Sequence, residues 1–252
     1  HIEVGESMAS PAKYFSNNTA NAVHLLDAMV RHDVGCFLFS STAAVYGEPE
    51  RVPIPEDAPL APVNPYGLSK LFVEQVLAEL SARQGLRYVS LRYFNAAGGD
   101  PEGRIGEGHV PETHLIPLVL QAALGQRDAI SVFGSDYPTP DGTCLRDYIH
   151  VCDLADAHVR ALQHLLDGGD SQIFNLGYGH GTSVREIVDT VRRITGREFR
   201  VIEAPRRAGD PASLVADSQR IRQTLGWQPR YDDLEQIVTH AWQWAKARAG
   251  GC

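Results

Sequence analysis

The sequence predicts an α/β protein with a doubly wound parallel sheet and a second, smaller α/β domain. Short apolar runs alternate along the chain with stretches that carry apolar residues at helical spacing, and this alternation is typical of parallel α/β folds. The 252 residues are ample for one or two domains with a sizeable core. We expect residues 1–96 and 145–177 to form the doubly wound domain, and residues 97–144 and 178–252 to form the smaller one.

The N-terminal third of the chain contains a helix, a strand, a loop and the start of a second helix. An apolar stripe at helical spacing covers residues 17–32, and residues 34–41 (VGCFLFSS) form the short apolar run of a buried parallel strand. The residues at 47–65 are rich in Pro, Glu and Asp and predict a long loop. Pro65 suits the first turn of the next helix, and Gly85 suits its C-terminal end.

The remaining elements alternate in the same way. Strands are predicted at residues 87–94, 130–133, 172–176 and 199–203. Helices are predicted at residues 115–124, 153–167, 182–195, 217–226 and 232–248. Thr182 and Asp217 carry oxygens that accept the free N–H groups of a first helical turn, so we expect each to cap its helix. Gly196 is expected to end the helix that Thr182 begins.

The composition excludes several classes of partner. The formal net charge is −8, so the chain offers no basic field to nucleic acid or to an anionic membrane surface. The longest apolar stretch, residues 115–124, is too short to span a bilayer. The four cysteines show neither metal-ligand nor C-x-x-C spacing, and we expect free thiols in a reducing, cytoplasmic setting. The histidines form no metal-ligand pattern in the sequence, so no metal site is predicted.

A tyrosine and a lysine one helical turn apart carry the strongest chemical signal. Tyr66 and Lys70 are at positions i and i+4, which places a phenol and an ammonium on one helix face. The phenol has an ordinary pKa of about 10, and a neighbouring ammonium lowers it, so the pair predicts a general acid/base. Thr42 follows the preceding strand, where open α/β sheets bind ligands, and its hydroxyl is a third candidate. From spacing alone, a surface tyrosine with a solvated lysine is the better interpretation.

Six segments together resemble the extended short-chain dehydrogenase/reductase family. They are residues 4–7 (VGES), 17–18 (NN), 40–42 (SST), 66–70 (YGLSK), 91–95 (LRYFN) and 147–155 (DYIHVCDLA). The resemblance implies a Rossmann-like first domain that binds NAD and a second domain that binds a nucleotide sugar. It also implies that Tyr66 is the acid/base, that Lys70 activates it and binds the nicotinamide ribose, and that Thr42 is the third catalytic group.

Two longer segments resemble the epimerases of this family that act on UDP-hexoses, residues 133–150 (FGSDYPTPDGTCLRDYIH) and 204–210 (APRRAGD). Family members that eliminate water or release carbon dioxide have acidic residues after the strand-end threonine, whereas Ala43 and Ala44 cannot transfer a proton. The implied activity is the interconversion of UDP-glucose and UDP-galactose by transient NAD-dependent oxidation at C4. Another nucleotide-sugar epimerase or decarboxylase of the family, or a non-catalytic UDP-sugar binder, is the alternative.

The resemblance also assigns binding residues by their positions in these motifs. NAD is expected to contact Asn17, Ser40, Ser41, Tyr66, Lys70 and Tyr93. The UDP-hexose is expected to contact Thr42, Asn95, His114, Leu115, Arg146, Arg207 and Asp210. The two arginines suit the diphosphate because a guanidinium offers several donors in a fixed fork. Leu214 falls where the family limits N-acetylated sugars, and its moderate size predicts some tolerance of them.

The resemblance finally bears on the N-terminus and on assembly. The family fold begins with a strand and a Gly-rich turn that holds the NAD pyrophosphate, and no such turn precedes Val4. By this comparison an opening βαβαβ half of about 60–80 residues is missing. If the polypeptide begins at His1, we expect poor stability and no retained NAD. The resemblance also implies a homodimer through helices at residues 17–31 and 66–84.

Overall fold

The computed structural model describes residues 1–207 and 210–250, and its chain forms two compact units. The first unit contains residues 1–94, 156–176 and 216–227, and the second contains the rest of the described chain. Residues 145–155 and 216–227 therefore group differently from the predicted division. Which unit binds cofactor and which binds substrate stays a prediction.

The first unit is built on a parallel sheet with the order β1-β2-β7, formed by β1 (Cys36–Thr42), β2 (Arg87–Tyr93) and β7 (Gln172–Leu176). Thr42 pairs with Tyr93, and Tyr93 pairs with Leu176, so the three strands end in register. The C-terminal edge of such a sheet is where open α/β folds bind their ligands. The sheet therefore fixes the place at which strand-end side chains of this unit gather.

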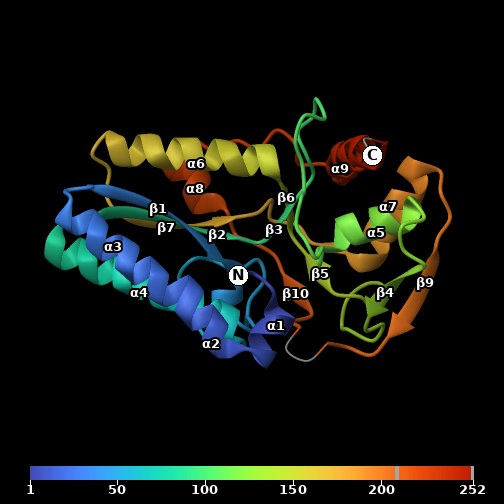
Figure 1. Ribbon diagram of the computed structural model, residues 1–252, viewed down its shortest axis with the longest axis horizontal. Coiled ribbons are helices and arrows are strands. Elements are labelled where there is room, and N and C mark those ends of the chain that lie inside the picture. The colour runs from blue at the N-terminus through green and yellow to red at the C-terminus, as the bar shows by residue number, and fades with distance from the viewer. Residues whose placement is uncertain (208–209, 251–252) are drawn as a thin grey trace. The chain divides into compact units, whose positions relative to one another are not determined.

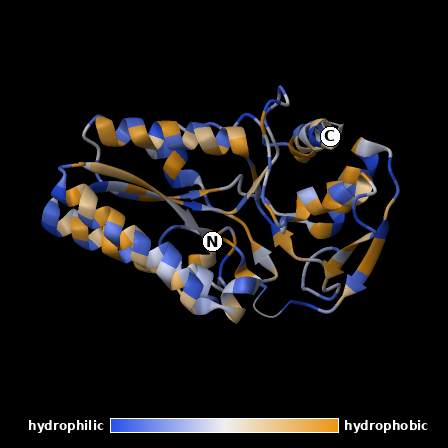
Figure 2. Ribbon diagram, viewed as in Figure 1, coloured by the Kyte–Doolittle hydropathy of each residue, from blue (hydrophilic) through white to orange (hydrophobic). Residues whose placement is uncertain are grey.

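Helices cover both faces of this sheet (Figure 1). Helices α3 (Asn21–Arg31) and α4 (Pro65–Gln84) lie on one face, and α6 (Val151–Leu166) and α8 (Gln219–Leu225) lie on the other. Hydrophobic and hydrophilic residues alternate along these helices, as Figure 2 shows. A buried cluster joins α3 and α4 to the sheet and contains Leu26, Phe39, Val73, Leu77, Leu86 and Tyr88. The predicted α/β class with a doubly wound parallel sheet is confirmed.

Short elements complete the first unit. The chain enters through α1 (Val4–Ala9), α2 (Pro11–Tyr14) and the π-helix η1 (Phe15–Ala20), which runs directly into α3. A single 3-10 turn, η2 (Ala43–Val45), follows β1. The sequence stretch predicted as one helix from residue 17 is thus a π-helical segment followed by an α-helix.

The second unit contains three small strand groups and three helices. Strand β5 (Leu145–Arg146) lies between β10 (Ser213–Leu214) and β8 (Thr182–Ser183), whereas β3 (Asn95–Ala97) pairs with β6 (Tyr148–His150) and β4 (Ala129–Phe133) with β9 (Arg200–Ala204). The helices of this unit are α5 (Leu115–Ala123), α7 (Val184–Thr195) and α9 (Leu234–Gly250). All predicted strands and helices of the C-terminal half are present, with ends that differ by a few residues.

The caps of α4 follow from its sequence. Pro65 occupies the first turn, and the Asn64 side chain accepts a hydrogen bond of 2.8 Å from the Gly67 N–H. Gly85 ends the helix in the left-handed conformation with φ of 73°, which glycine adopts without a Cβ penalty. The predicted start and end of the helix are confirmed, and the capping asparagine was not predicted.

Two predicted caps are wrong by one residue. The cap of α7 is Ser183, whose side chain and that of Glu186 form a reciprocal capping box, while Thr182 pairs with Arg146 in the β-ladder. The N-cap position of α8 is Ser218, although the Asp217 carboxylate accepts the Gln219 N–H at 3.0 Å. The Asp217 N–H bonds the Ile54 carbonyl, which places Asp217 just before the helix.

Three thiols, those of Cys36, Cys144 and Cys152, are free. The fourth cysteine, Cys252, lies outside the described residues. Within residues 1–207 and 210–250, no helix combines the length and the apolar character that crossing a membrane requires.

Candidate active site

Thr42 marks the C-terminal end of β1 and is buried, with 6% of its surface exposed. Its Oγ1 accepts a hydrogen bond of 3.1 Å from the Ala44 N–H and so begins the 3-10 turn η2. The same side chain lies close enough to the Tyr66 phenol to lower its pKa. The structure therefore brings two of the three predicted catalytic side chains together at the edge of the sheet.

Helix α4 approaches this edge closely because its third residue is glycine. A Cβ built on Gly67 would lie 2.5 Å from the Ala44 carbonyl oxygen, far inside contact distance. Only a residue without a side chain lets the first turn of α4 rest on η2. Gly67 thus sets how near the adjacent Tyr66 comes to Thr42.

The Tyr66 phenol has a raised pKa, contrary to the expected effect of the lysine. Burial raises this pKa, and the hydrogen bond with Thr42 lowers it in part. The Lys70 ammonium instead donates a hydrogen bond of 3.1 Å to the Ser40 carbonyl and lies 5.2 Å from the centre of the Phe39 ring. The lysine is directed at the strand in this arrangement, and the prediction that its ammonium acidifies the phenol stays a prediction.

Ser40 and Tyr93 lie side by side at the same edge. The Tyr93 hydroxyl donates a hydrogen bond of 2.8 Å to the Ser40 hydroxyl and also contacts the His158 ring. Burial raises the pKa of Tyr93 to about 12, so the group is a neutral hydrogen-bonding hydroxyl at physiological pH. Ser40 and Tyr93, two of the predicted cofactor ligands, are therefore in contact, and Ser40 also accepts a hydrogen bond from Lys70.

These side chains fit the ribose end of NAD. An ammonium has three N–H donors, and among the described residues only the Ser40 carbonyl accepts a hydrogen bond from Lys70. The remaining N–H donors of Lys70 lie in partly buried surroundings, which lower its pKa. A hydroxyl partner is favourable there, because a buried donor without a partner is costly. Lys70 would hold the ribose hydroxyls, with the Ser40 and Tyr93 hydroxyls beside it.

Two other predicted cofactor ligands lie apart from this group. The Ser41 side chain points to the opposite face of β1, where its hydroxyl donates a hydrogen bond of 2.5 Å to the buried Glu74 carboxylate. Successive strand residues face opposite sides of a sheet, so Ser40 and Thr42 point together and Ser41 does not. Asn17 is exposed in η1. A cofactor role for Ser41 is thus limited to its main chain, and that of Asn17 stays a prediction.

The second unit brings together the predicted diphosphate and ribose ligands. Arg146 is buried, with 8% exposed, and its guanidinium forms an ion pair with the Asp210 carboxylate. A second guanidinium nitrogen of Arg146 donates to the Leu145 carbonyl at 2.7 Å. Arg207 is exposed and stacks on the Phe133 ring at 3.9 Å from its centre. The unit therefore offers a fixed guanidinium, that of Arg146, and a more exposed one, that of Arg207.

The other predicted substrate residues have mixed surroundings. Asn95 begins β3, half-buried, and its main-chain N–H bonds the Asp147 carbonyl at 2.9 Å, next to Arg146. Leu115 packs against a buried cluster of the second unit. His114 precedes α5 at its N-cap position without a side-chain cap. Nothing in these contacts assigns a substrate role to Leu115, whose side chain serves the core.

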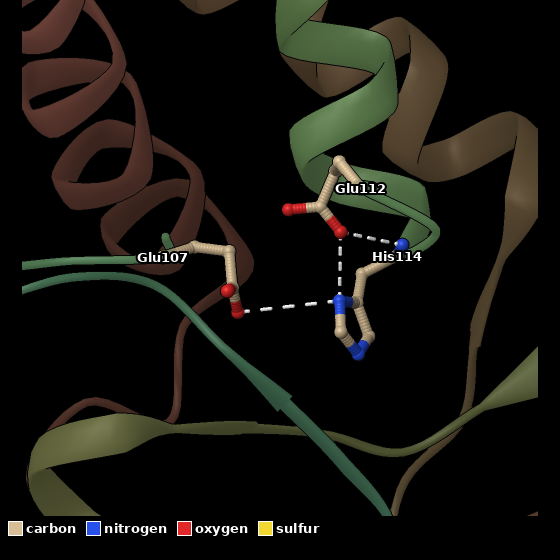
Figure 3. Close-up of side chains that lie close together, drawn as sticks. All are labelled: Glu107, Glu112 and His114. Carbon is tan, nitrogen blue, oxygen red and sulfur yellow. Dashed lines mark hydrogen bonds and ion pairs between the residues drawn. The ribbon is translucent and has the colours of Figure 1, made fainter. Parts of the chain in front are cut away.

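His114 is held by a carboxylate of its own loop (Figure 3). Its Nδ1 lies 2.8 Å from a Glu112 oxygen and 4.0 Å from a Glu107 oxygen. The three residues are close enough to share an ion. The Glu112 oxygen is already hydrogen-bonded to the main-chain N–H groups of Thr113 and His114. The prediction of no metal stays a prediction.

Sequence reasoning missed a buried polar network behind the catalytic edge. Arg92 of β2 binds the Glu74 carboxylate of α4 through two nitrogens, at 3.0 and 2.6 Å. Tyr46 joins them by accepting a hydrogen bond of 2.8 Å from Arg92. The available signal was the spacing of Glu74, which follows Lys70 by four residues on a face that is otherwise apolar.

Comparisons with known proteins agree with this arrangement. The model of the NAD dependent epimerase/dehydratase family matches residues 2–177. The UDP-glucose 4-epimerase of Halalkalibacterium halodurans is 53% identical over 248 residues, which are 98% of this chain and 74% of that protein. The crystal structure of a UDP-glucose 4-epimerase has a TM-score of 0.96 at 52% identity, covering 100% of this chain and 77% of that one. That of the Brucella ovis enzyme in complex with NAD has a TM-score of 0.94 at 50% identity, covering 97% and 76%. The chain belongs to the NAD dependent epimerase/dehydratase family.

Proposed function

We propose that the chain is the catalytic part of an epimerase that interconverts UDP-glucose and UDP-galactose with NAD as cofactor. The observation that carries the proposal is the Tyr66 phenol, which lies beside Thr42 at the C-terminal end of β1 and one helical turn from Lys70. Relatives that are 53% and 52% identical carry the name UDP-glucose 4-epimerase. Ala43 and Ala44 add no acid beside the threonine, which disfavours elimination of water.

The chain's own residues supply the proton chemistry. NAD, when bound, supplies a hydride acceptor that returns the same hydride to the sugar. Tyr66 takes the proton of the sugar 4-hydroxyl and gives it back to the 4-keto oxygen, with Thr42 hydrogen-bonded to the reacting oxygens. Lys70 holds the ribose hydroxyls, and this contact fixes its ammonium one helical turn from the Tyr66 phenol.

Arg146, Arg207 and Asp210 hold the nucleotide in this proposal. Arg146 is oriented by Asp210 and by its own main chain, which leaves part of its donor fork for a diphosphate oxygen. Arg207 rests on Phe133, and this stacking orders its guanidinium without using its N–H donors. An epimerase must hold the nucleotide firmly while the hexose turns, and a double arginine anchor suits that need.

The activity is tested with purified chain, NAD and UDP-glucose, by following UDP-galactose with NMR. Tyr66→Phe is expected to lower kcat about 10²–10⁴-fold, because it removes the proton carrier. Tyr88→Phe, a buried tyrosine of the same unit, is the matched control and is expected to keep the wild-type rate. UDP binding without any UDP-galactose would favour the non-catalytic binder, and released CO₂ or net NADH would favour another activity of the family. An unaltered rate in Tyr66→Phe refutes the assigned chemistry.

We also propose that the enzyme is a homodimer through α3 and α4. Phe72 and Leu25 are exposed on these helices, at 38% and 52%. A groove beside Phe72 is lined by Thr19, Gln75, Val76, Glu79 and Leu80. Phe72→Glu is expected to shift sedimentation towards the monomer, whereas Val159→Glu, an exposed apolar position on α6, is not. Equal sedimentation of wild type and Phe72→Glu contradicts the dimer through this face.

A further inference from the structure

The geometry points to Glu74 and Arg92 as positioning residues that hold the catalytic tyrosine against the end of β1. The inference rests on the proposed function for its kinetic readout. Three consecutive residues of β1 bind α4, since the Ser40 carbonyl accepts from Lys70 and the Ser41 hydroxyl donates to Glu74. The next residue, Thr42, lies close enough to the Tyr66 phenol to lower its pKa. Tyr66, Lys70 and Glu74 follow one another at intervals of four along α4, so one helix face makes all three contacts.

Only the Glu74 contact is free of the reacting groups. Tyr66 exchanges a proton during turnover, and Lys70 is proposed to bind a cofactor, so the hydrogen bonds of both change partners. Glu74 faces only protein, with 3% of its side chain exposed, and its partner Arg92 has 2% exposed. The pair can therefore keep the helix and the strand in place while the other two contacts change.

The contact is rigid because Arg92 grips both carboxylate oxygens. Its Nε donates to one oxygen at 3.0 Å and a terminal nitrogen donates to the other at 2.6 Å. A planar fork on a carboxylate fixes orientation as well as distance. Because Arg92 belongs to β2 and Glu74 to α4, the fork fixes the helix relative to the sheet, and Ser41 extends the connection to β1.

The remaining nitrogen of Arg92, Nη1, binds residues that follow Thr42 in the chain. It donates to the Tyr46 hydroxyl at 2.8 Å and to the Glu56 carbonyl at 3.2 Å. Tyr46 in turn donates to the Asn175 side chain of β7 at 2.7 Å. Tyr46, after Thr42, therefore binds the Arg92 guanidinium directly, and Ser41, before Thr42, is connected to it through Glu74.

Stability alone is a poor reason for this pair. Removing two charges from water is costly, and replacing a buried ion pair by apolar residues of similar volume is often neutral or stabilising. A buried ion pair can instead fix one geometry among several. Here the geometry that it fixes is the approach of Tyr66 to Thr42.

The test replaces the pair by apolar residues in the full chain with NAD present. The double variant Glu74→Leu/Arg92→Met is expected to fold with a melting temperature near that of wild type. Its kcat is expected to fall about ten- to hundredfold with little change in KM for UDP-glucose, because a small misplacement of a catalytic group has that effect. The control Arg193→Met/Glu235→Leu removes an exposed ion pair of the second unit and is expected to keep kcat.

A second readout needs no turnover. The Tyr66 phenol is titrated by NMR of ¹³C-labelled tyrosine, with the signal assigned by Tyr66→Phe. Loss of the Thr42 hydrogen bond is expected to move the Tyr66 titration in the double variant to higher pH. This measurement stands even if wild type forms no UDP-galactose, so it separates failure of the inference from failure of the proposed function. A folded double variant with wild-type kcat and an unmoved titration overturns the inference.

A milder variant covers the case in which the double variant does not fold. Ser41→Ala removes one hydrogen bond from Glu74 and leaves both charges paired. Its kcat is expected to fall about three- to tenfold, with a smaller shift of the Tyr66 titration in the same direction. Ser41→Thr keeps the hydroxyl and is expected to restore both. If Ser41→Ala matches wild type in both measurements, the positioning role is refuted.

Discussion

Substituting Gly67 by alanine should separate Tyr66 from Thr42 without touching either residue. The new Cβ would lie 2.5 Å from the Ala44 carbonyl oxygen and 2.9 Å from its carbonyl carbon. Real Cβ contacts essentially never fall below 3.0 Å, and ordinary contact begins at 3.4 Å. The first turn of α4 must therefore move from η2 by about 0.5–0.9 Å, because a main-chain oxygen cannot rotate away as a flexible side chain can.

That movement predicts a kinetic loss larger than the loss of stability. A misplacement of 1 Å costs about 10²-fold in rate, so Gly67→Ala is expected to lower kcat about ten- to hundredfold. Overpacking costs about 1–3 kcal/mol, and the better helix propensity of alanine returns about 1 kcal/mol. The net loss of about 0–2 kcal/mol lowers the melting temperature by no more than about 8 °C in a chain of this size.

The assay compares kcat in both directions of the reaction with the thermal unfolding of the same samples. Gly35→Ala is the matched control, because a Cβ at Gly35 meets no atom within 4 Å. The control is expected to keep wild-type kcat and melting temperature. A Gly67→Ala enzyme with wild-type kcat would show that the close approach of α4 to η2 does not set the catalytic geometry.

Three further predictions concern pH, the threonine and the sugar. Burial, reinforced by His240, lowers the pKa of His150 to about 4, so the unfolded chain binds the extra proton between about pH 6.5 and 4. The free energy of unfolding by urea should therefore fall as pH drops through this range, and less steeply in His150→Phe. Thr42→Val should raise the pKa of Tyr66 and move the acidic limb of the kcat/KM profile to higher pH, whereas Thr42→Ser should leave it in place. Leu214→Tyr should lower kcat/KM for UDP-N-acetylglucosamine relative to UDP-glucose about tenfold or more, and equal ratios would remove the assigned role of Leu214.

The strands that position the site follow from local patterns, and their order does not. The apolar runs at residues 34–41 and 87–94 and the strand at 172–176 are continuous enough to be read as buried parallel strands, and they form β1, β2 and β7. The predicted Thr182 cap is wrong by one residue, because Ser183 and Glu186 form a capping box. The spacing of this serine and glutamate, three residues apart, was the local signal that favoured Ser183.

Two of the three proposed catalytic residues could be selected from the sequence because they lie close together in it, whereas their supporting residues could not. Tyr66 and Lys70 are one turn apart, so a single segment reveals them. Arg92, Glu74 and Tyr46 come from three different elements, and each looks like an ordinary surface residue in its own segment. Their burial follows only from the packing of α4 on the sheet.

The chemistry of Tyr66 shows most clearly what spacing leaves undetermined. Positions i and i+4 place the phenol and the Lys70 ammonium on one face, but they do not say which acceptor the ammonium chooses. The Ser40 carbonyl takes it, so burial governs the pKa of Tyr66 and raises it, with only the Thr42 hydrogen bond acting in the opposite direction. In the proposed mechanism, a half-buried phenol that must release a proton near neutral pH depends on how firmly Thr42 is held beside it. The residues that hold α4 on the sheet are for this reason part of the acid/base chemistry, even though they never touch the sugar.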